Sequence, residues 1–331
     1  MRLGVLDIGS NTVHLLLVDA HPGARPVPFA SHKRPLSLVQ YLEPDGSINE
    51  AGQHELTDFV LEAWEFAARH KADDLLAFCT SAIREATNGA AVLARVKHET
   101  TVTLQELSGS EEASMTFFAV RRWHGWGAGP ILNLDIGGGS FEMAFGQDEL
   151  PEMATSVPLG ASRLTRDWLS EDPPSARSVK ELRRYIRATL KPAVSQFDGL
   201  GRANVVAGTS KTFRSLARIA GAAPSASGPY VKRELQASDL GVWAQRISAM
   251  SSEDRLHLPG VSEARADQLL AGALVAEAAL ELFKFKKIRI CPWALREGLI
   301  LRRLDQLVFA GPLDPAPHIA QQTAPELGAG I

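Results

Sequence analysis

One short pattern occurs twice in this chain of 331 residues. Residues 5–10 read Val-Leu-Asp-Ile-Gly-Ser, and residues 133–140 read Asn-Leu-Asp-Ile-Gly-Gly-Gly-Ser. Each copy is an apolar run with an aspartate, followed by a glycine turn that contains a serine. An aspartate at a strand end can hold a divalent cation, and adjacent glycines let backbone N–H groups approach phosphate oxygens. Two copies indicate a duplicated fold whose halves face each other across a phosphate-binding cleft.

The composition is that of a globular protein long enough for two domains, with 45% hydrophobic and 22% charged residues. A formal charge of −3 argues against a nucleic-acid-binding surface, so a polyanionic ligand needs locally clustered cations. The two cysteines, Cys79 and Cys291, lie in apolar runs and indicate buried thiols of a reducing compartment. No apolar run approaches the roughly 20 residues that span a bilayer, and no signal-peptide cleavage pattern occurs. We therefore expect a cytoplasmic protein without membrane contact.

The segments after both glycine turns favour strands. Residues 141–145 alternate between apolar and other side chains with a period of two, and Thr12–Val18 is rich in β-branched and apolar residues. A dinucleotide-binding glycine loop opens a helix instead. The pattern therefore excludes a Rossmann site.

The glycine-rich segment Gly125–Pro130 is the best candidate for a domain boundary. We predict an N-terminal domain over residues 1–125, a C-terminal domain over residues 126–309, and a disordered tail over residues 310–331, which are rich in Pro, Gly, Ala and Gln.

The periodicity of apolar residues predicts the helices and the remaining strands. Helices are expected over residues 49–67 (capped by Asn49), 110–123, 178–197, 213–220, 264–284 and 294–304. Further strands are expected over residues 75–80, 102–107, 204–207 and 287–291.

Residues 107–113, Leu-Ser-Gly-Ser-Glu-Glu-Ala, begin one of these helices. A capped helix with Glu111 and Glu112 near its positive N-terminus explains the pattern. In the functional alternative, one carboxylate faces the cleft as a general base that activates water for attack on phosphorus. Adjacent residues lie about 100° apart around a helix, so we expect only one of the two to face the cleft.

Two further segments are candidates for anion binding. The turn Gly208-Thr209-Ser210-Lys211 lies between a strand and a helix and offers backbone donors, hydroxyls and a cation, but lacks the spacing of a Walker P-loop. A capped strand–helix turn explains it equally well. Arg84 follows a buried strand and could clamp a phosphate, or pair with Glu85 or a surface acid. Arg296 and Glu297 favour a structural ion pair.

Taken together, these segments resemble the exopolyphosphatase / guanosine pentaphosphate phosphohydrolase (Ppx/GppA) family, and most closely the short actinobacterial-type exopolyphosphatases. The resemblance spans residues 3–304 and rests on Asp7-Ile8-Gly9-Ser10-Asn11-Thr12, Thr80–Asn88, Ser108–Ala113, Asp135–Glu142, Gly208-Thr209 and Leu295-Arg296-Glu297-Gly298. It implies an α/β fold of two ribonuclease-H-like domains of the actin/Hsp70/sugar-kinase superfamily, with the active site in the interdomain cleft. The last helix, 294–304, would complete the first domain.

The resemblance also implies a role for each site residue. Glu112 would be the general base, with Glu111 beside it, and Asp135 and Glu142 would bind Mg²⁺ and orient water with support from Asp7. The phosphate-binding residues would be Gly9, Ser10, Asn11, Thr12, Arg84, Gly137, Gly138, Gly139, Ser140, Gly208, Thr209, Ser210 and Lys211.

The expected activity is Mg²⁺-dependent release of terminal orthophosphate from inorganic polyphosphate. Terminal phosphoanhydride hydrolysis requires charge neutralisation, a positioned water and a base, and the residues above supply all three. Three alternatives stay open at this point: removal of the 5′ γ-phosphate of guanosine pentaphosphate, an actin-like ATP-binding module or kinase, and an inactive polyphosphate-binding regulator. By resemblance we expect a homodimer.

Overall fold

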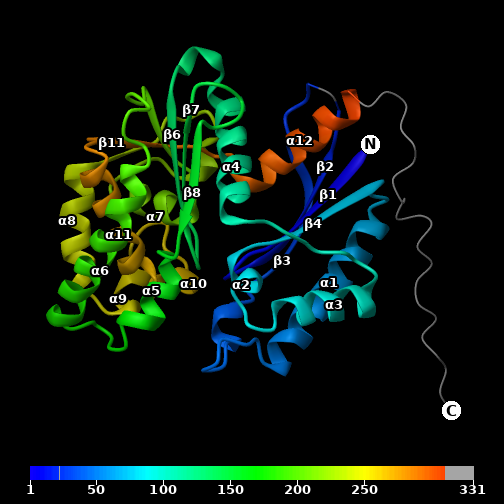
Figure 1. Ribbon diagram of the computed structural model, residues 1–331, viewed down its shortest axis with the longest axis horizontal. Helices are drawn as coiled ribbons and strands as arrows, with labels where there is room; N and C mark the ends of the chain where they lie inside the picture. The colour runs from blue at the N-terminus through cyan, green and yellow to red at the C-terminus, as the bar shows by residue number, and fades with distance from the viewer. Residues whose placement is uncertain (22, 310–331) are drawn as a thin grey trace.

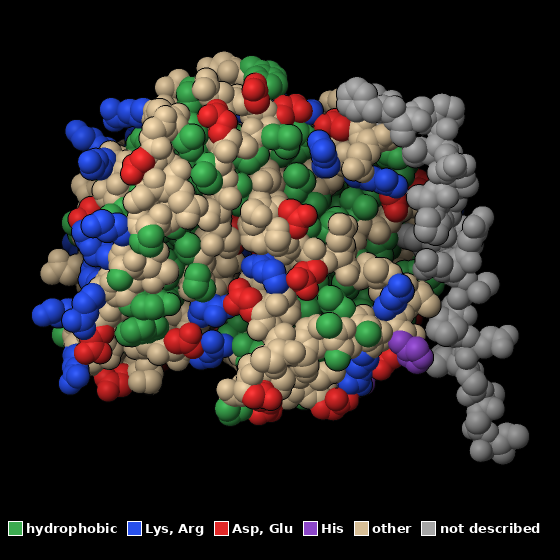
Figure 2. Space-filling view, viewed as in Figure 1, with side chains coloured by type: hydrophobic (Ala, Val, Ile, Leu, Met, Phe, Trp, Pro, Cys, Tyr) green, Lys and Arg blue, Asp and Glu red, His purple; other side chains and the backbone are tan. Residues whose placement is uncertain are grey.

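The computed structural model describes residues 1–21 and 23–309, which fold into two lobes built around separate sheets (Figure 1). The predicted tail over residues 310–331 lies outside the described residues. Lys and Arg side chains gather along one margin of the second lobe (Figure 2). No helix within the described ranges is both long and apolar enough to cross a membrane.

The first lobe contains a five-stranded sheet. Its strands are β1 (Arg2–Ile8), β2 (Val13–Asp19), β3 (Pro28–Arg34), β4 (Asp74–Cys79) and β5 (Gln105–Glu106), in the order β3-β2-β1-β4-β5. Its helices are α1 (Glu50–Arg69), α2 (Ser81–Arg84) and α3 (Gly89–Thr100). The predicted cap is confirmed, because the Asn49 side chain accepts the Gly52 N–H at 2.9 Å. The strand expected over residues 102–107 shortens to β5, because this edge strand pairs with β4 at only two positions.

The second lobe repeats this plan with a six-stranded sheet, β10-β11-β9-β6-β7-β8. The strands are β6 (Ile131–Ile136), β7 (Phe141–Gly146), β8 (Met153–Val157), β9 (Val205–Gly208), β10 (Glu234–Gln236) and β11 (Lys287–Ile290). The helices are α5 (Ala161–Trp168), α6 (Ala176–Ser195), α7 (Lys211–Ile219), α8 (Ala237–Ser248), α9 (Ser252–Leu256), α10 (Glu263–Ala266) and α11 (Leu269–Leu282). The single helix expected over 264–284 is divided into α10 and α11, where the Asp267 carboxylate accepts the Gln268 N–H at 2.8 Å.

The two sheets are built alike. In the first, β1 pairs antiparallel with β2 and parallel with β4, and in the second β6 pairs antiparallel with β7 and parallel with β9. Each glycine turn joins the central antiparallel pair, β1 to β2 and β6 to β7. The α/β fold with a duplicated core is therefore confirmed.

Two helices lie between the lobes (Figure 1). Helix α4 (Gly109–His124) packs Ala113, Phe117 and Val120 into a cluster with residues of the second sheet. Helix α12 (Leu295–Phe309) packs on α4 and buries Leu299 and Ile300 with residues of β1. The division of the chain at residues 125/126 stays a prediction, and α4, which precedes it, contacts the second sheet.

The close approach of α12 to α4 leads to a stability prediction for Gly298. A Cβ at this position would lie 2.0 Å from the backbone oxygen of Met115, so a side chain would force the helices apart. We expect Gly298→Ala to lower the free energy of unfolding by about 1–3 kcal/mol, measured by denaturant titration. Gly127→Ala is the control, because nothing lies within 4 Å of a Cβ there. Equal unfolding midpoints for the two variants would contradict this account of the helix contact.

Candidate active site

The two glycine turns have the same hydrogen-bonded shape. The Gly9 N–H donates to the Thr12 carbonyl at 3.2 Å, and the Gly137 N–H donates to the Ser140 carbonyl at 2.9 Å. The turns also meet, because a Cβ at Gly138 would lie 2.6 Å from Asn11 Nδ2. The expectation that the duplicated turns face each other is therefore confirmed.

The consecutive glycines of the second turn, 137–139, also allow close packing, in addition to exposing backbone N–H groups. A Cβ at Gly139 would lie 2.5 Å from the Ser81 hydroxyl and 3.1 Å from the Ser10 hydroxyl, both in the opposite lobe. From the other side, Arg163 Nε donates to the Gly139 carbonyl at 2.8 Å, and the Arg163 side chain also pairs with Glu85 of the first lobe. The turn is therefore narrow because it is packed between parts of both lobes.

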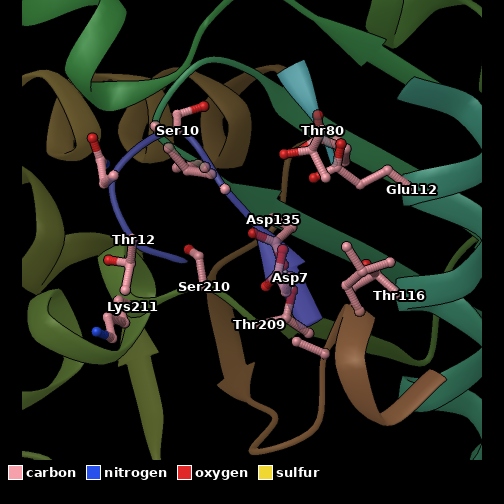
Figure 3. Close-up of a pocket in the computed structure, with 18 of the residues that line it drawn as sticks. Asp7, Ser10, Thr12, Thr80, Glu112, Thr116, Asp135, Thr209, Ser210 and Lys211 are labelled. Atoms are coloured by element: carbon pink, nitrogen blue, oxygen red, sulfur yellow. Dashed lines mark hydrogen bonds between the residues drawn. The ribbon is translucent and has the colours of Figure 1, made fainter. Parts of the chain in front are cut away.

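A cavity of about 290 Å³ lies between the turns (Figure 3). It brings together most of the predicted site residues: Asp7, Gly9, Ser10, Asn11, Thr12, Glu112, Asp135, Gly137, Gly138, Ser140, Glu142, Thr209, Ser210 and Lys211. Four predicted residues do not line it: Arg84, Glu111, Gly139 and Gly208. A Cβ at Gly208 would meet Phe213 and Ile288, so this glycine borders the apolar core.

Asp135 and Glu142 lie directly opposite each other on β6 and β7. The Thr209 hydroxyl donates to Asp135 at 2.5 Å, and the Ser156 hydroxyl donates to Glu142 at 2.8 Å. Burial raises the pKa of Asp135 to about 6 and the pKa of Glu142 to about 7, against ordinary values near 4. The protein thus concentrates negative charge in a place where little solvent can stabilise it.

Glu112 reaches the same space from the first turn of α4 (Figure 3). Its Oε2 is buried and has no hydrogen-bond partner among the described residues. Burial and then the carboxylates of Glu142 and Asp135 hold the pKa of Glu112 well above its ordinary value, opposed by the Arg84 guanidinium at 3.7 Å. A buried carboxylate oxygen that accepts no hydrogen bond is uncommon and marks a position for a ligand, a water or an ion.

Glu111, the neighbouring acid, caps the start of helix α4. Its carboxylate accepts the Ser108 N–H at 2.8 Å, while its own N–H donates to the Ser108 hydroxyl at 3.2 Å. This reciprocal capping box lowers the pKa of Glu111 and holds its side chain at the start of α4, away from the cavity. We therefore correct the prediction that Glu111 is catalytic: of the two adjacent acids, Glu111 caps the helix and Glu112 faces the cavity.

Two other predicted phosphate ligands have protein partners. Arg84 donates to the Leu107 carbonyl at 2.6 Å and lies between Glu85 and Glu112, so it contacts Glu112 from outside the cavity lining. The Asn11 side chain donates to Gln268 at 3.0 Å and accepts from the Ser162 hydroxyl at 2.8 Å. Asn11 thus joins the first turn to the second lobe as well as bordering the cavity.

Five basic side chains line the cavity without having been predicted there: His14, Lys33, Arg214, Arg265 and Arg296. Arg296 Nε lies 3.9 Å from Asp7, and its guanidinium contacts His14. The expected Arg296–Glu297 ion pair is wrong, because Glu297 instead accepts the Ala294 N–H at 2.8 Å at the start of α12. The sequence pattern includes the segment 295–298 that contains Arg296, but it does not mark Lys33, Arg214 or Arg265.

Three of these cations surround Lys211. Burial is the main cause that lowers the pKa of Lys211, and the charges of Arg265, Arg214 and Lys33 lower it further. The cavity therefore has a carboxylate-rich part, formed by Asp7, Glu112, Asp135 and Glu142, and a cationic part around Lys211.

The carboxylate-rich part fits a hard divalent cation in its chemistry, since its four acids offer only oxygen donors and their charge is compensated only in part, by Arg296 beside Asp7 and Arg84 beside Glu112. Within the described residues, however, no three or more His, Cys, Asp or Glu side chains are placed so that they could hold a metal ion together. A cation held by Asp7, Asp135 and Glu142 would therefore need water or phosphate oxygens as further ligands, as is usual for Mg²⁺.

Comparison with known proteins decides the family. Residues 17–307 match the Ppx/GppA phosphatase family. The chain belongs to this family. Exopolyphosphatase 1 of Mycobacterium tuberculosis is 53% identical over 306 residues, covering 92% of this chain and 89% of the relative, and that of Mycobacterium leprae is 51% identical over 305 residues, covering 92% and 90%. The predicted similarity to actinobacterial exopolyphosphatases is confirmed.

Family members of known structure share the fold. The crystal structure of an exopolyphosphatase from Cytophaga hutchinsonii matches with a TM-score of 0.82 at 25% identity, covering 92% of this chain and 98% of that one. The Aquifex aeolicus family member matches with a TM-score of 0.76 at 24% identity, covering 92% and 98%. The second likeness concerns the fold alone.

The buried acids of this Ppx/GppA family member predict how its stability depends on pH. Because folding raises the pKa of Asp135 and Glu142, the folded state binds these protons more tightly than the unfolded chain. Their stabilising contribution is fully present below about pH 4 and is lost as the pH rises through 6 and 7. We expect the unfolding temperature in EDTA to fall between about pH 5 and pH 8, and added Mg²⁺ to raise it more at the higher pH.

The control for this prediction is the double variant Asp135→Asn, Glu142→Gln, in which the pH dependence and the effect of Mg²⁺ should both be much smaller. A wild-type unfolding temperature that does not change over this range, or that changes equally in the double variant, would contradict the assignment.

Proposed function

We propose that this protein is an exopolyphosphatase that uses Mg²⁺ and releases orthophosphate from the ends of inorganic polyphosphate. The observation that carries the proposal is Glu112 Oε2, which accepts no hydrogen bond from the described residues and is buried beside a cavity bounded by two facing glycine turns. The names of the mycobacterial relatives support the same activity.

In this proposal the terminal phosphoryl group lies between the two turns. Backbone N–H groups that the turns do not use internally, together with the Ser10 and Thr12 hydroxyls, contact its oxygens. The cationic part around Lys211, with Arg214 and Arg265, holds the following phosphates of the chain. Asp7, Asp135 and Glu142 would hold the divalent cation, which supplies neutralisation of negative charge on the phosphoryl oxygens when it is bound.

Glu112 acts as the general base. Its carboxylate accepts a proton from the attacking water as the new P–O bond forms and the bond to the bridging oxygen breaks, and the bridging oxygen leaves with the shortened chain. The high pKa of Glu112 makes it a strong base once ionised, and Arg84 at 3.7 Å favours the ionised form. Glu142, on strand β7, orients the attacking water. The cytoplasmic location and the homodimeric state stay predictions.

The test is a phosphate-release assay over polyphosphates of several lengths, with guanosine pentaphosphate and ATP as comparators at equal concentration. We expect release from polyphosphate to be fastest, to require Mg²⁺ and to stop in EDTA. Faster release from guanosine pentaphosphate than from any polyphosphate would replace the proposed substrate by the nucleotide.

A further inference from the structure

A second cavity lies in the second lobe and shares no lining residue with the active-site cavity. Its volume is about 370 Å³, and aromatic and aliphatic side chains dominate its wall: Leu132, Phe145, Val194, Phe197, Phe283 and Phe285. Phe197 and Phe283 pack edge to face with ring centres 5.4 Å apart. Asp198, Arg202 and Lys284 are the charged residues of its lining. A space with aromatic walls suits a flat ring system. We call it the aromatic cavity.

A cationic groove of about 330 Å³ continues from the aromatic cavity. The two spaces share Arg202, Ala203 and Phe285, and the Arg202 guanidinium lies 6.0 Å from the centre of the Phe285 ring. Arg202 therefore lies at the boundary between the aromatic cavity and the cationic groove. The other basic residues of the groove are Lys286, Lys287 and Arg289.

The positive charge of this groove is largely uncompensated. Its one lining acid is Glu234, which already pairs with Lys287 and with Lys232, each at 3.1 Å. Over residues 1–21 and 23–309, none of Arg202, Lys286 and Arg289 forms an ion pair with an acid. The groove lies in the lobe whose margin carries the gathered Lys and Arg side chains (Figure 2). Three free cations beside an aromatic cavity predict a ligand with several negative charges next to its ring.

We propose that the aromatic cavity and the cationic groove together form a binding site for a nucleoside polyphosphate. The base enters the aromatic cavity, and the phosphates lie along the groove on Arg202 and Lys286. An inorganic polyanion would leave the aromatic cavity empty, and an acyl carboxylate would leave most of the groove cations without a partner. The nucleotide is the ligand class that uses both spaces.

The site lies at the end of the second sheet away from the active site. Val205 and Val206, at the start of β9, line the groove, whereas Thr209, just beyond the end of β9, lines the active-site cavity. Leu132 and Phe145 are opposite each other on β6 and β7 and line the aromatic cavity, while Asp135 and Glu142 are the opposite pair further along the same strands. The two sites are therefore separate but share three strands.

The test is calorimetric titration of the full chain with ADP, with adenosine and pyrophosphate as separate probes. We expect ADP to bind the wild-type protein more tightly than either probe. The double variant Arg202→Glu, Lys286→Glu removes two phosphate contacts at exposed positions and should weaken ADP binding about tenfold or more. Lys180→Glu with Arg184→Glu, at exposed positions of α6, makes the same change of charge elsewhere and should leave ADP affinity unchanged.

A third variant, Val194→Phe, partly fills the aromatic cavity and should weaken ADP binding while leaving pyrophosphate binding unchanged. Thermal unfolding of each variant checks its fold. Equal ADP affinity of the wild type and the Arg202/Lys286 variant, or equal binding of ADP and pyrophosphate, would overturn the proposal. Polyphosphate hydrolysis should be the same in all these proteins, so its presence or absence tests the proposed function separately.

Discussion

Replacement of Glu112 by glutamine is expected to lower kcat for polyphosphate hydrolysis about a thousandfold or more, with little change in KM. Glutamine keeps the size of the side chain but cannot accept the proton of the attacking water, and a positioned base contributes about 10²–10⁴-fold to such a reaction. Removing a buried negative charge next to Asp135 and Glu142 should not impair the fold. The measurement is steady-state phosphate release, with binding of substrate to the inactive variant measured separately.

Glu111→Gln is the matched control, one residue away on the same helix. Glu111 forms the capping box with Ser108, so the amide should weaken the cap and cost about 1 kcal/mol or less of unfolding free energy. Its kcat should stay within a few-fold of the wild type. A Glu112→Gln protein with wild-type turnover would remove Glu112 from the mechanism. A Glu111→Gln protein as inactive as Glu112→Gln would show that the loss is not specific to the Glu112 carboxylate and would contradict the assignment of Glu111 as a capping residue only.

The contrast between these neighbours shows what a sequence pattern can predict here. Helical geometry predicts that only one of the two acids faces the cleft. The spacing Ser108-x-x-Glu111 is itself a capping-box signal and identifies Glu111 as the capping residue, although the prediction kept both acids in the site. The repeated turns were predictable for a similar reason, since their strand–turn–strand pattern is local.

The cationic part of the cavity was not predictable in this way. Arg214 follows Lys211 by three residues on α7, so helical geometry alone places the two on one face. Arg265 of α10 reaches them through the fold of the second lobe, and Lys33 of β3 only because the two lobes meet. The sequence neighbours of Lys33 and Arg265 resemble those of any surface cation, so no local rule identifies these two. Asn11 illustrates the same point, because its contacts with Ser162 and Gln268 depend on residues more than 150 positions away.

The structure also distinguishes two aspartates that the repeat makes equivalent. Asp7 and Asp135 each precede a glycine turn by two residues. Asp7 lies 3.9 Å from the Arg296 guanidinium, which already compensates part of its charge. Asp135 accepts a hydrogen bond from the Thr209 hydroxyl and lies opposite a second carboxylate, that of Glu142. The charges of Arg214 and Arg265 also lower the pKa of Asp135, but among the described residues neither forms an ion pair with it, so of the two aspartates Asp135 is the better candidate for a bound cation.

We therefore expect Asp135→Asn to lower kcat about 100-fold or more and to shift Mg²⁺ activation to higher concentrations, since even residues that only support a metal ligand contribute 10–100-fold. Asp7→Asn should have a smaller effect on both quantities, because Arg296 would remain to interact with the substrate oxygens. Asparagine still accepts the Thr209 hydrogen bond, so the β6–β7 hairpin should keep its shape. The measurement is kcat as a function of Mg²⁺ concentration for the two variants. If Asp7→Asn proved the more damaging, Asp7 of the first lobe would replace Asp135 as the main candidate for holding the metal.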